Sequence, residues 1–560
     1  MFVAQVCINQ QDNTEKSAQV ALMGDIYRRC SRARIWLGCD ASECNLRHQN
    51  KDERKTTRER TDPFEFTRLL ENHVNEWPCF VKHGEDKTRI RFEPRAAFLN
   101  VWNRHMKIYQ SLWWSRMWTV QEAVLPPKAS IMYDTWSMLF EEFLDHGNKA
   151  LTSHVKECCG EAFLLLPVRM RIEMILQVTK GDSLRCDLGR LRREALLNLD
   201  SCLVNHGHRQ CHDPRDKIYG MLGLINDESR KILPDYSASL ASVFYHATSD
   251  LLEAPGGGLH SLIGVQHGPS VHKWASWVRD FDQQCTQHHN SMNTMKKEIY
   301  TIFNAGGSTP SSYEIWSSWP CLPDLKPNQV ALAVTGRCVG TITAISQETC
   351  ALREMPVYGQ AGASSCFKAW MHFAEFDSEA HATGRHSTAN EQIWRTILCG
   401  VVNAGKPSDS SNWRRFKSDD MKLLGPFVHF LETGIMPGLY EPTSSTHTTA
   451  CSKTYFRTRS GGHGLCYPTC RPGDQVWVLH GARVPFVLRS IDVDTKIEEN
   501  VLRPPEAYIR DNTGSIIGVK EGFEPRTAHY QLIGDCYYDG FMDGEGLDDE
   551  KYHAQSILLV

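Results

Sequence analysis

Residues 2–38 read FVAQVCINQQDNTEKSAQVALMGDIYRRCSRARIWLG, and this stretch decides the fold of the N-terminal part of the chain. The apolar run at 2–8 predicts a short strand, and Asp12, followed three residues later by a glutamate, forms the capping-box pattern that begins a helix. Apolar residues recur every three or four positions over 20–30, which predicts an amphipathic helix. A buried strand is predicted at 34–38. Strand, helix and strand in this order are the unit of a parallel α/β layer.

Two further segments extend this pattern. Residues 115–125 predict a helix that ends at Pro126-Pro127, because proline cannot continue it, and residues 129–133 predict another strand. In the motif Asp213-Pro-Arg-Asp216, the first aspartate is the predicted N-cap of a helix, with proline at its first position. Strands are also expected farther along the chain, over 330–342, 475–479 and 485–489.

The fold class expected from these patterns is α/β, within a chain that is mixed α+β overall. A parallel sheet at the N-terminus is followed by a helical middle and a strand-rich C-terminal part. The segments expected are a domain at 1–135, a mainly helical region at 136–283, a linker at 284–312 and an α+β region at 313–560 that is rich in strands over 455–540.

The composition excludes several classes of protein. The 560 residues carry 62 Lys and Arg against 66 Asp and Glu, so the basic excess of a nucleic-acid or anionic-membrane binder is missing. No apolar stretch is long enough to span a membrane, and the first residues lack the pattern of a secretory signal. Twenty cysteines without a C-x-x-C pair are too few for a disulfide scaffold. We therefore expect a cytoplasmic protein that neither spans a membrane nor binds nucleic acid.

Histidine and cysteine cluster in two places without the spacing of a metal site. Cys202 precedes the run His206-Gly-His-Arg-Gln-Cys-His212, and a second group consists of His463, Cys466 and Cys470. Neither group has the ligand spacing of a zinc finger or ribbon. The sequence also lacks G-x-S-x-G, H-E-x-x-H and a G-x-G-x-x-G in a usable context. We expect no metal site, no bound cofactor and none of the common hydrolase or dehydrogenase active sites.

One motif places a charge beside apolar residues, Trp118-Thr-Val-Gln-Glu122. Residues four apart share a helix face, so Glu122 is expected to lie over Trp118, with Leu125 completing an apolar stripe. A carboxylate at the edge of such a stripe is either a structural anion with satisfied hydrogen bonds or a catalytic group whose neutral form is favoured by desolvation. The residues alone leave both interpretations open.

Several motifs, taken together, resemble the fungal heterokaryon incompatibility (HET) domain family. The N-terminal matches are Cys7-Ile-Asn-Gln10, Ile35-Trp-Leu-Gly38 and Ser115-Arg-Met-Trp-Thr-Val-Gln-Glu-Ala-Val-Leu125. The later ones are Asp213-Pro-Arg-Asp-Lys-Ile-Tyr-Gly-Met-Leu-Gly-Leu224, Pro234-Asp-Tyr236, Trp274-Ala-Ser-Trp277 and Gly534-Asp-Cys-Tyr-Tyr-Asp-Gly-Phe-Met-Asp-Gly-Glu545. Their order is that of the family. The resemblance implies a role in nonself recognition, in which incompatible hyphal fusion triggers growth arrest and programmed cell death.

The HET domain is itself similar to the Toll/interleukin-1 receptor (TIR) domain, which implies a partial TIR- or flavodoxin-like parallel sheet in this chain. TIR enzymes that cleave NAD place the catalytic glutamate in a W-x-x-x-E motif on a helix, and Trp118 and Glu122 match that motif. The resemblance therefore implies that Glu122 is a catalytic residue that polarises or contacts the nicotinamide riboside during cleavage, with Trp118 as a supporting residue. The resemblance also implies that NAD is a substrate, but it does not indicate which residues bind NAD.

The sequence differs from the family pattern at its start. The family carries a strand with an Ala-Leu-Ser-Tyr-x-Trp-Gly-like motif well before its Cys-Ile-Asn-Gln, whereas here Met1 is close to Cys7. Ala4 replaces the usual aspartate, and Phe2 replaces the usual tryptophan. We therefore expect an N-terminally truncated member whose parallel sheet lacks its first strand.

Three functions follow from the resemblance and this difference. The first is a TIR-like NAD glycohydrolase. The second is a non-enzymatic interaction module that acts through unknown protein partners or self-association, with the helix after Asp12 and the strand at Ile35 as its contact surface. The third is an inactive truncated relative.

Overall fold

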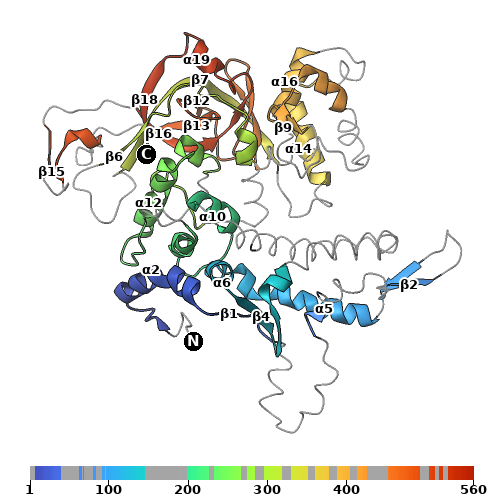
Figure 1. Cartoon of the computed structure of the whole chain (residues 1–560). Coiled ribbons are helices and arrows are strands. Elements are labelled where there is room, and N and C mark those ends of the chain that lie inside the picture. Colours follow the sequence, from blue (N-terminus) through green and yellow to red (C-terminus); the bar gives the residue numbers. More distant parts are fainter. Residues whose placement is uncertain are drawn as a thin grey trace, which may run out of the picture. The chain divides into compact units, whose positions relative to one another are not determined.

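The computed structural model of the chain divides into two compact units, Met1–Tyr236 and Ser237–Val560 (Figure 1). We call them unit 1 and unit 2. The structure describes residues 7–39, 62–65, 67, 80–83, 91–94, 96–144, 188, 198–225, 232–265, 274–283, 296–317, 330–350, 360–377, 387–403, 413–424, 452–491, 504–510, 516–520 and 528–560. The four segments expected from the sequence stay a prediction.

Unit 1 combines helices with a three-stranded sheet. Its helices, with 3₁₀ turns labelled η, are α2 (Asn13–Arg29), α5 (Ala96–Gln110), η3 (Leu112–Ser115), α6 (Thr119–Val124), α10 (Leu199–His206), α11 (Asp216–Tyr219) and η4 (Leu222–Leu224). Its strands are β1 (Ala33–Trp36), β2 (Phe80–His83), β3 (Arg91–Pro94), β4 (Ala129–Tyr133) and β5 (Trp136–Leu139).

Helix α2 begins where the capping box predicts. The side chain of Asp12 accepts hydrogen bonds from the backbone N–H groups of Thr14 and Glu15, at 2.9 and 3.1 Å. The side chain of Glu15 in turn accepts one from the backbone N–H of Asn9, at 3.1 Å. Only the last two residues of the strand predicted over 2–8 are described, and neither is in a strand. The others lie outside the described residues.

The sheet of unit 1 confirms the predicted parallel layer. Strands β1 and β4 pair in parallel, with Ile35 opposite Ile131, and β5 returns antiparallel to β4. Strand β4 has the bounds predicted from the sequence, and the strand predicted at 34–38 is β1. Helix α6 packs against β1 and α2, so the sheet supports the segment that carries the W-x-x-x-E motif. The chain is therefore mixed α/β, with a small parallel sheet near its N-terminus.

Helix α2 and η4 touch through their backbones. A Cβ atom on Gly24 would lie 2.9 Å from the Cα of Gly223, and one on Gly223 would lie 3.0 Å from the Cα of Gly24. The same Cβ on Gly223 would also overlap the side-chain oxygen of Gln121. That side chain is buried and donates to the carbonyl of Gly220 at 2.8 Å, so it has little room to move. The close approach therefore requires glycine at both positions.

Replacing Gly223 with alanine is expected to lower the free energy of unfolding by about 1–3 kcal/mol, because the added methyl group forces a backbone shift between α2 and η4. Urea unfolding followed by tryptophan fluorescence would measure the change. Leu22→Ala serves as the control, since Leu22 is an exposed side chain of α2 and its truncation opens no core cavity. An unfolding midpoint of Gly223→Ala equal to that of the unaltered protein would contradict this packing.

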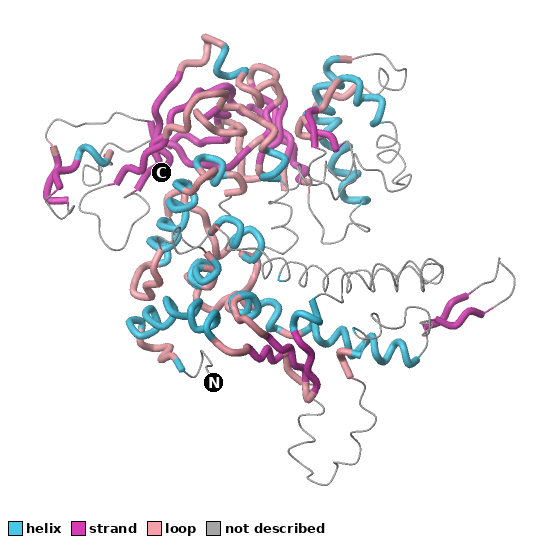
Figure 2. Tube along the Cα trace, viewed as in Figure 1, coloured by secondary structure: helices cyan, strands magenta, loops and turns pink. Residues whose placement is uncertain are grey.

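Unit 2 is dominated by strands (Figure 2). Its strands are β6 (Tyr313–Ser317), β7 (Val330–Thr349), β8 (Val401–Asn403), β9 (Trp413–Arg415), β10 (Thr454–Thr458), β11 (His463–Cys466), β12 (Gln475–Leu479), β13 (Phe486–Ile491), β14 (Tyr508–Arg510), β15 (Ile516–Val519), β16 (Ala528–Asp535), β17 (Tyr537–Tyr538) and β18 (Ala554–Leu559). Its helices are α12 (Leu240–Glu253), η6 (Gly258–Leu262), α14 (Gln360–Phe373), α16 (Thr388–Ile397), η9 (Ser418–Leu424), η10 (Pro505–Ala507) and α19 (Glu545–Asp548).

The long strand β7 closes part of this sheet into a ring. Its first half pairs with β18, its middle with β12 and its last part with β10. Because β12 also pairs with β13, β13 with β16, and β16 with β18, the ladder returns to β7. Apolar side chains fill the inside of the sheet, among them Val339, Val476 and Val487. The strands predicted over 330–342, 475–479 and 485–489 are thus confirmed as β7, β12 and β13.

None of the described helices combines the length and the apolar composition needed to cross a membrane.

Candidate functional site

The W-x-x-x-E segment changes from a 3₁₀ turn to an α-helix. The hydroxyl of Thr119, which has one hydrogen to donate, lies within hydrogen-bond distance of the backbone carbonyls of both Trp113 and Arg116, at 2.8 and 2.7 Å, at the break between η3 and α6. The helix predicted over 115–125 is therefore shorter than expected. Trp118 occupies the N-cap of α6 instead of a position within the helix.

A short parallel bridge joins this segment to the loop after α10. Arg116 and Gln210 are the bridge partners. The backbone N–H of Met117 donates to the carbonyl of Gln210 at 2.8 Å, and the N–H of Gln210 donates to the carbonyl of Ser115 at 2.6 Å. The buried ammonium group of Lys217 donates to two carbonyls of the same loop. These bonds fix the start of α11 opposite Trp118.

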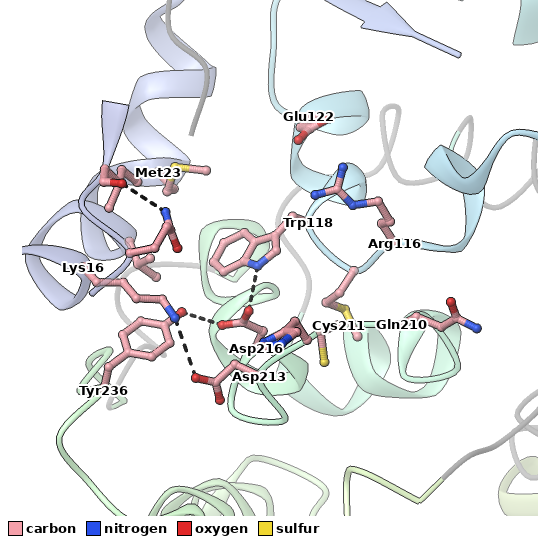
Figure 3. Close-up of a pocket in the computed structure, with 15 residues that line it drawn as sticks. Lys16, Met23, Arg116, Trp118, Glu122, Gln210, Cys211, Asp213, Asp216 and Tyr236 are labelled. Atoms are coloured by element: carbon pink, nitrogen blue, oxygen red, sulfur yellow. Dashed lines mark hydrogen bonds and ion pairs between the residues drawn. The ribbon is translucent and has the colours of Figure 1, made fainter. Parts of the chain in front are cut away.

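These elements, together with α2 and Tyr236, line an open cavity of about 650 Å³ within unit 1 (Figure 3). A cavity of this volume is within the range of small-molecule binding sites. Its apolar lining comes from Ile8, Val20, Met23 and Met117. The charged side chains that line it are Lys16, Arg116, Glu122, Asp213 and Asp216.

Asp216 is the buried one among these charged residues, with 7% of its surface exposed. Its Oδ2 atom accepts a hydrogen bond from Nε1 of Trp118 at 3.0 Å, and its Oδ1 atom accepts one from the hydroxyl of Tyr236 (Figure 3). Burial raises the pKa of Asp216, and the nearby charge of Asp213 adds to this rise. The hydrogen bonds from Tyr236 and Trp118 act in the opposite direction without cancelling it.

Asp213 is in the opposite electrostatic situation. Nε and Nη2 of Arg215 donate to its two carboxylate oxygens at 3.0 and 2.9 Å, and Nζ of Lys16 lies 3.6 Å from Oδ2. Burial works to raise the pKa of Asp213, but Arg215 and Lys16 outweigh it, so the pKa lies below its ordinary value. The cavity therefore contains two neighbouring carboxyl groups whose pKa values are shifted apart. Groups paired in this way are typical of functional sites.

Glu122 lines the same cavity from α6 and has partners of its own. Its Oε2 atom accepts a hydrogen bond from Nε1 of Trp113 at 3.1 Å. Burial, together with the Glu122 carboxylate beside it, raises the pKa of Tyr27, so that phenol stays protonated. The side chain of Trp118 points toward Asp216 (Figure 3). The expected arrangement, with Glu122 over Trp118, is thus replaced by one in which each side chain has a separate partner, because Trp118 precedes the helix.

Both residues predicted for the site, Trp118 and Glu122, line the cavity, and their catalytic role stays a prediction. The sequence did not point to Lys16, Asp216 or Tyr236 as site residues. The predicted N-cap at Asp213 is wrong, since α11 begins at Asp216 and is preceded by an arginine N-cap. The charges of the motif Asp213-Pro-Arg-Asp216 could have indicated site residues, because one aspartate is enough to cap the start of a helix and the motif has two.

Two side chains of the histidine and cysteine group, Cys202 and His208, have shifted pKa values. Burial raises the pKa of Cys202 to about 12. Burial and the nearby charges of Arg209 and Lys217 lower the pKa of His208 to about 3. Within the described residues, no three His, Cys, Asp or Glu side chains are grouped so as to hold a metal ion.

Comparisons with known proteins give two matches. Residues 1–122 match the family model described as heterokaryon incompatibility protein (HET). The chain is also similar to heterokaryon incompatibility protein 6, OR allele, of Neurospora crassa. The two are 23% identical over an alignment 626 residues long, which covers 98% of this chain and 81% of the relative. No solved structure matches the chain. The family model includes Trp118 and Glu122, whereas Asp213 and Asp216 lie beyond the residues that it matches.

Proposed function

The chain is a member of the heterokaryon incompatibility (HET) family, and from this membership we propose that it acts in fungal nonself recognition, where incompatible hyphal fusion leads to growth arrest and cell death. Fusion mixes the cytoplasms of two hyphae, so we place the protein in the cytoplasm. Its trigger would be another protein or a second copy of the chain.

The activity we propose is TIR-like cleavage of NAD in the cavity of unit 1. The observation that supports it is the position of Trp118 and Glu122, the two residues of the W-x-x-x-E motif, on one cavity of about 650 Å³. In this reaction the bond between the nicotinamide nitrogen and the ribose breaks, and its electron pair neutralises the ring nitrogen. Water then adds to the ribose and releases a proton. The carboxylate of Glu122 stabilises the positive charge that develops on the sugar.

The charges around the cavity are compatible with this substrate. NAD combines a cationic nicotinamide ring with an anionic pyrophosphate. The carboxylate of Glu122 lines the cavity, and its charge complements the cationic ring. Arg116 also lines the cavity, and its charge complements a pyrophosphate.

A second candidate function is a non-enzymatic interaction module. Its support is the exposure of large apolar side chains on α2 and β1, where Leu22 is 50% and Trp36 is 51% exposed. In the described sheet, β1 is an edge strand that pairs only with β4. An edge strand with an exposed aromatic residue is a surface on which a partner chain can pair.

Controlled expression in a filamentous fungus would test both functions, with hyphal growth and viability as the readout. The unaltered protein is expected to arrest growth, and Glu122→Gln is expected to abolish the arrest. Glu298→Gln, which changes an exposed carboxylate of unit 2, is the matched control and should leave the arrest intact.

The interaction module makes the opposite prediction in the same assay. Under that function, Trp36→Glu abolishes the arrest and Glu122→Gln does not. This pattern would contradict the enzymatic function.

A further inference from the structure

We propose that Asp216 binds sugar hydroxyl groups of the ligand in the cavity of unit 1, and that Trp118 and Tyr236 are positioning residues that hold its carboxylate. The assignment rests on the proposed NAD-cleaving function and adds a second ligand-binding carboxylate to Glu122. The two carboxylates have separate indole partners, since Trp113 donates to Glu122 and Trp118 donates to Asp216.

The carboxylate of Asp216 is fixed from two sides. Trp118 at the N-cap of α6 holds Oδ2 at 3.0 Å, and the hydroxyl of Tyr236 holds Oδ1. Tyr236 is itself fixed by its backbone. Its N–H donates to the hydroxyl of Ser17 at 2.9 Å, and its carbonyl accepts from Arg215 at 2.6 Å. The orientation of the carboxylate is therefore set before a ligand binds, which lowers the entropic cost of binding.

Each oxygen of this carboxylate has acceptor capacity left. A carboxylate oxygen can accept two hydrogen bonds, and Oδ1 and Oδ2 of Asp216 each accept one from the residues that the structure describes. The side chain lines the cavity, so the two remaining positions are available to a ligand. Two acceptor positions on one fixed carboxylate match two neighbouring hydroxyl donors, as on a ribose. Acidic side chains bind ribose hydroxyls in this way in dinucleotide-binding folds.

Charge balance supports a ligand-binding role over a structural one. The guanidinium of Arg215 and the ammonium of Lys16 pair with Asp213. Among the described residues, no Lys or Arg side chain lies within ion-pair distance of the buried Asp216, and the charge of Lys16 acts on it only from farther away. Burial of a carboxylate without a direct ion pair is costly, and such costs are often retained at functional sites.

Calorimetric titration of the full chain carrying Glu122→Gln, which is not expected to consume the ligand, would test the assignment. The probes are nicotinamide riboside and its deoxyribose analogue. Asp216→Asn is expected to weaken riboside binding roughly 10–100-fold and to remove the preference for the riboside over the deoxyriboside. Trp118→Phe removes the indole donor, keeps an aromatic ring and is expected to weaken binding less. Asp25→Asn, a change at an exposed carboxylate of α2, should leave both affinities unchanged.

The outcomes separate this proposal from the proposed function. Riboside binding that depends on Asp216, without NAD cleavage by the unaltered protein, would overturn only the enzymatic function. If Asp216→Asn folds with an unchanged thermal midpoint and retains affinity and preference, Asp216 is not a ligand-binding residue. Failure of the riboside to bind the Glu122→Gln chain overturns the assignment as well. Should Asp216→Asn fail to fold, an unchanged affinity of Trp118→Phe would overturn it.

Discussion

Asp535→Asn is expected to lower the free energy of unfolding of unit 2 by about 3–5 kcal/mol. Asp535 lies at the end of β16 and is fully buried between two lysines, with Oδ2 at 2.7 Å from Nζ of Lys296 and 2.9 Å from Nζ of Lys453. The hydroxyl of Tyr467 donates to Oδ1 at 2.9 Å. Asparagine keeps the size of the side chain and removes its charge, so two ammonium groups stay buried without an anion.

The pH dependence of this contribution has a defined sign. Burial works to raise the pKa of Asp535, but Lys296 and Lys453 outweigh it and hold the pKa well below its ordinary value. Because the pKa is lower in the folded state, the stabilisation is fully present above the unfolded pKa of about 3.9 and is lost progressively as the pH falls from there toward the folded pKa. The difference in stability between the unaltered protein and Asp535→Asn should therefore shrink below about pH 4.

Urea unfolding at pH 7 and at pH 3 would measure both effects. The matched control is Asp549→Asn, because Asp549 forms an exposed ion pair with Lys551 at 2.7 Å, and exposed pairs contribute little to stability. Equal unfolding midpoints for Asp535→Asn and the unaltered protein at pH 7 would contradict the account of this buried cluster.

Local signals made the N-terminal elements predictable from the sequence. Asp12 caps α2 by accepting hydrogen bonds from N–H groups only two and three residues farther along the chain. The apolar run of β4 is bounded by prolines and a turn. The strands β12 and β13 were predictable for the same reason. The closure of the sheet could not be predicted from the sequence, because β7 pairs with β18 more than 200 positions away, as in the pair of Leu332 and Leu559.

The site divides in the same way. Trp118 and Glu122 belong to one five-residue motif, so they could be singled out together. Their partners could not, since Trp118 meets Asp216 across 98 positions of sequence and Tyr236 is 20 positions farther on. A helix pattern over 115–125 also conceals the break at Thr119, which depends on side-chain bonds to backbone carbonyls.

Glu122→Gln is expected to lower the rate of NAD cleavage roughly 100–1000-fold. Glutamine has the shape of glutamate and retains an oxygen that can accept the hydrogen bond from Nε1 of Trp113, which is 3.1 Å long in the unaltered protein. It lacks the negative charge that stabilises the positive charge on the sugar in the transition state. The loss should therefore fall on kcat, while the unfolding midpoint stays close to that of the unaltered protein.

Release of nicotinamide from NAD by the purified 560-residue chain, measured beside Glu122→Gln and Glu298→Gln, tests directly whether the cavity of unit 1 cleaves NAD. We expect release by the unaltered protein and by Glu298→Gln, and its loss in Glu122→Gln. Equal rates in all three proteins, or no release by a folded unaltered protein, would contradict the claim that the cavity of unit 1 cleaves NAD.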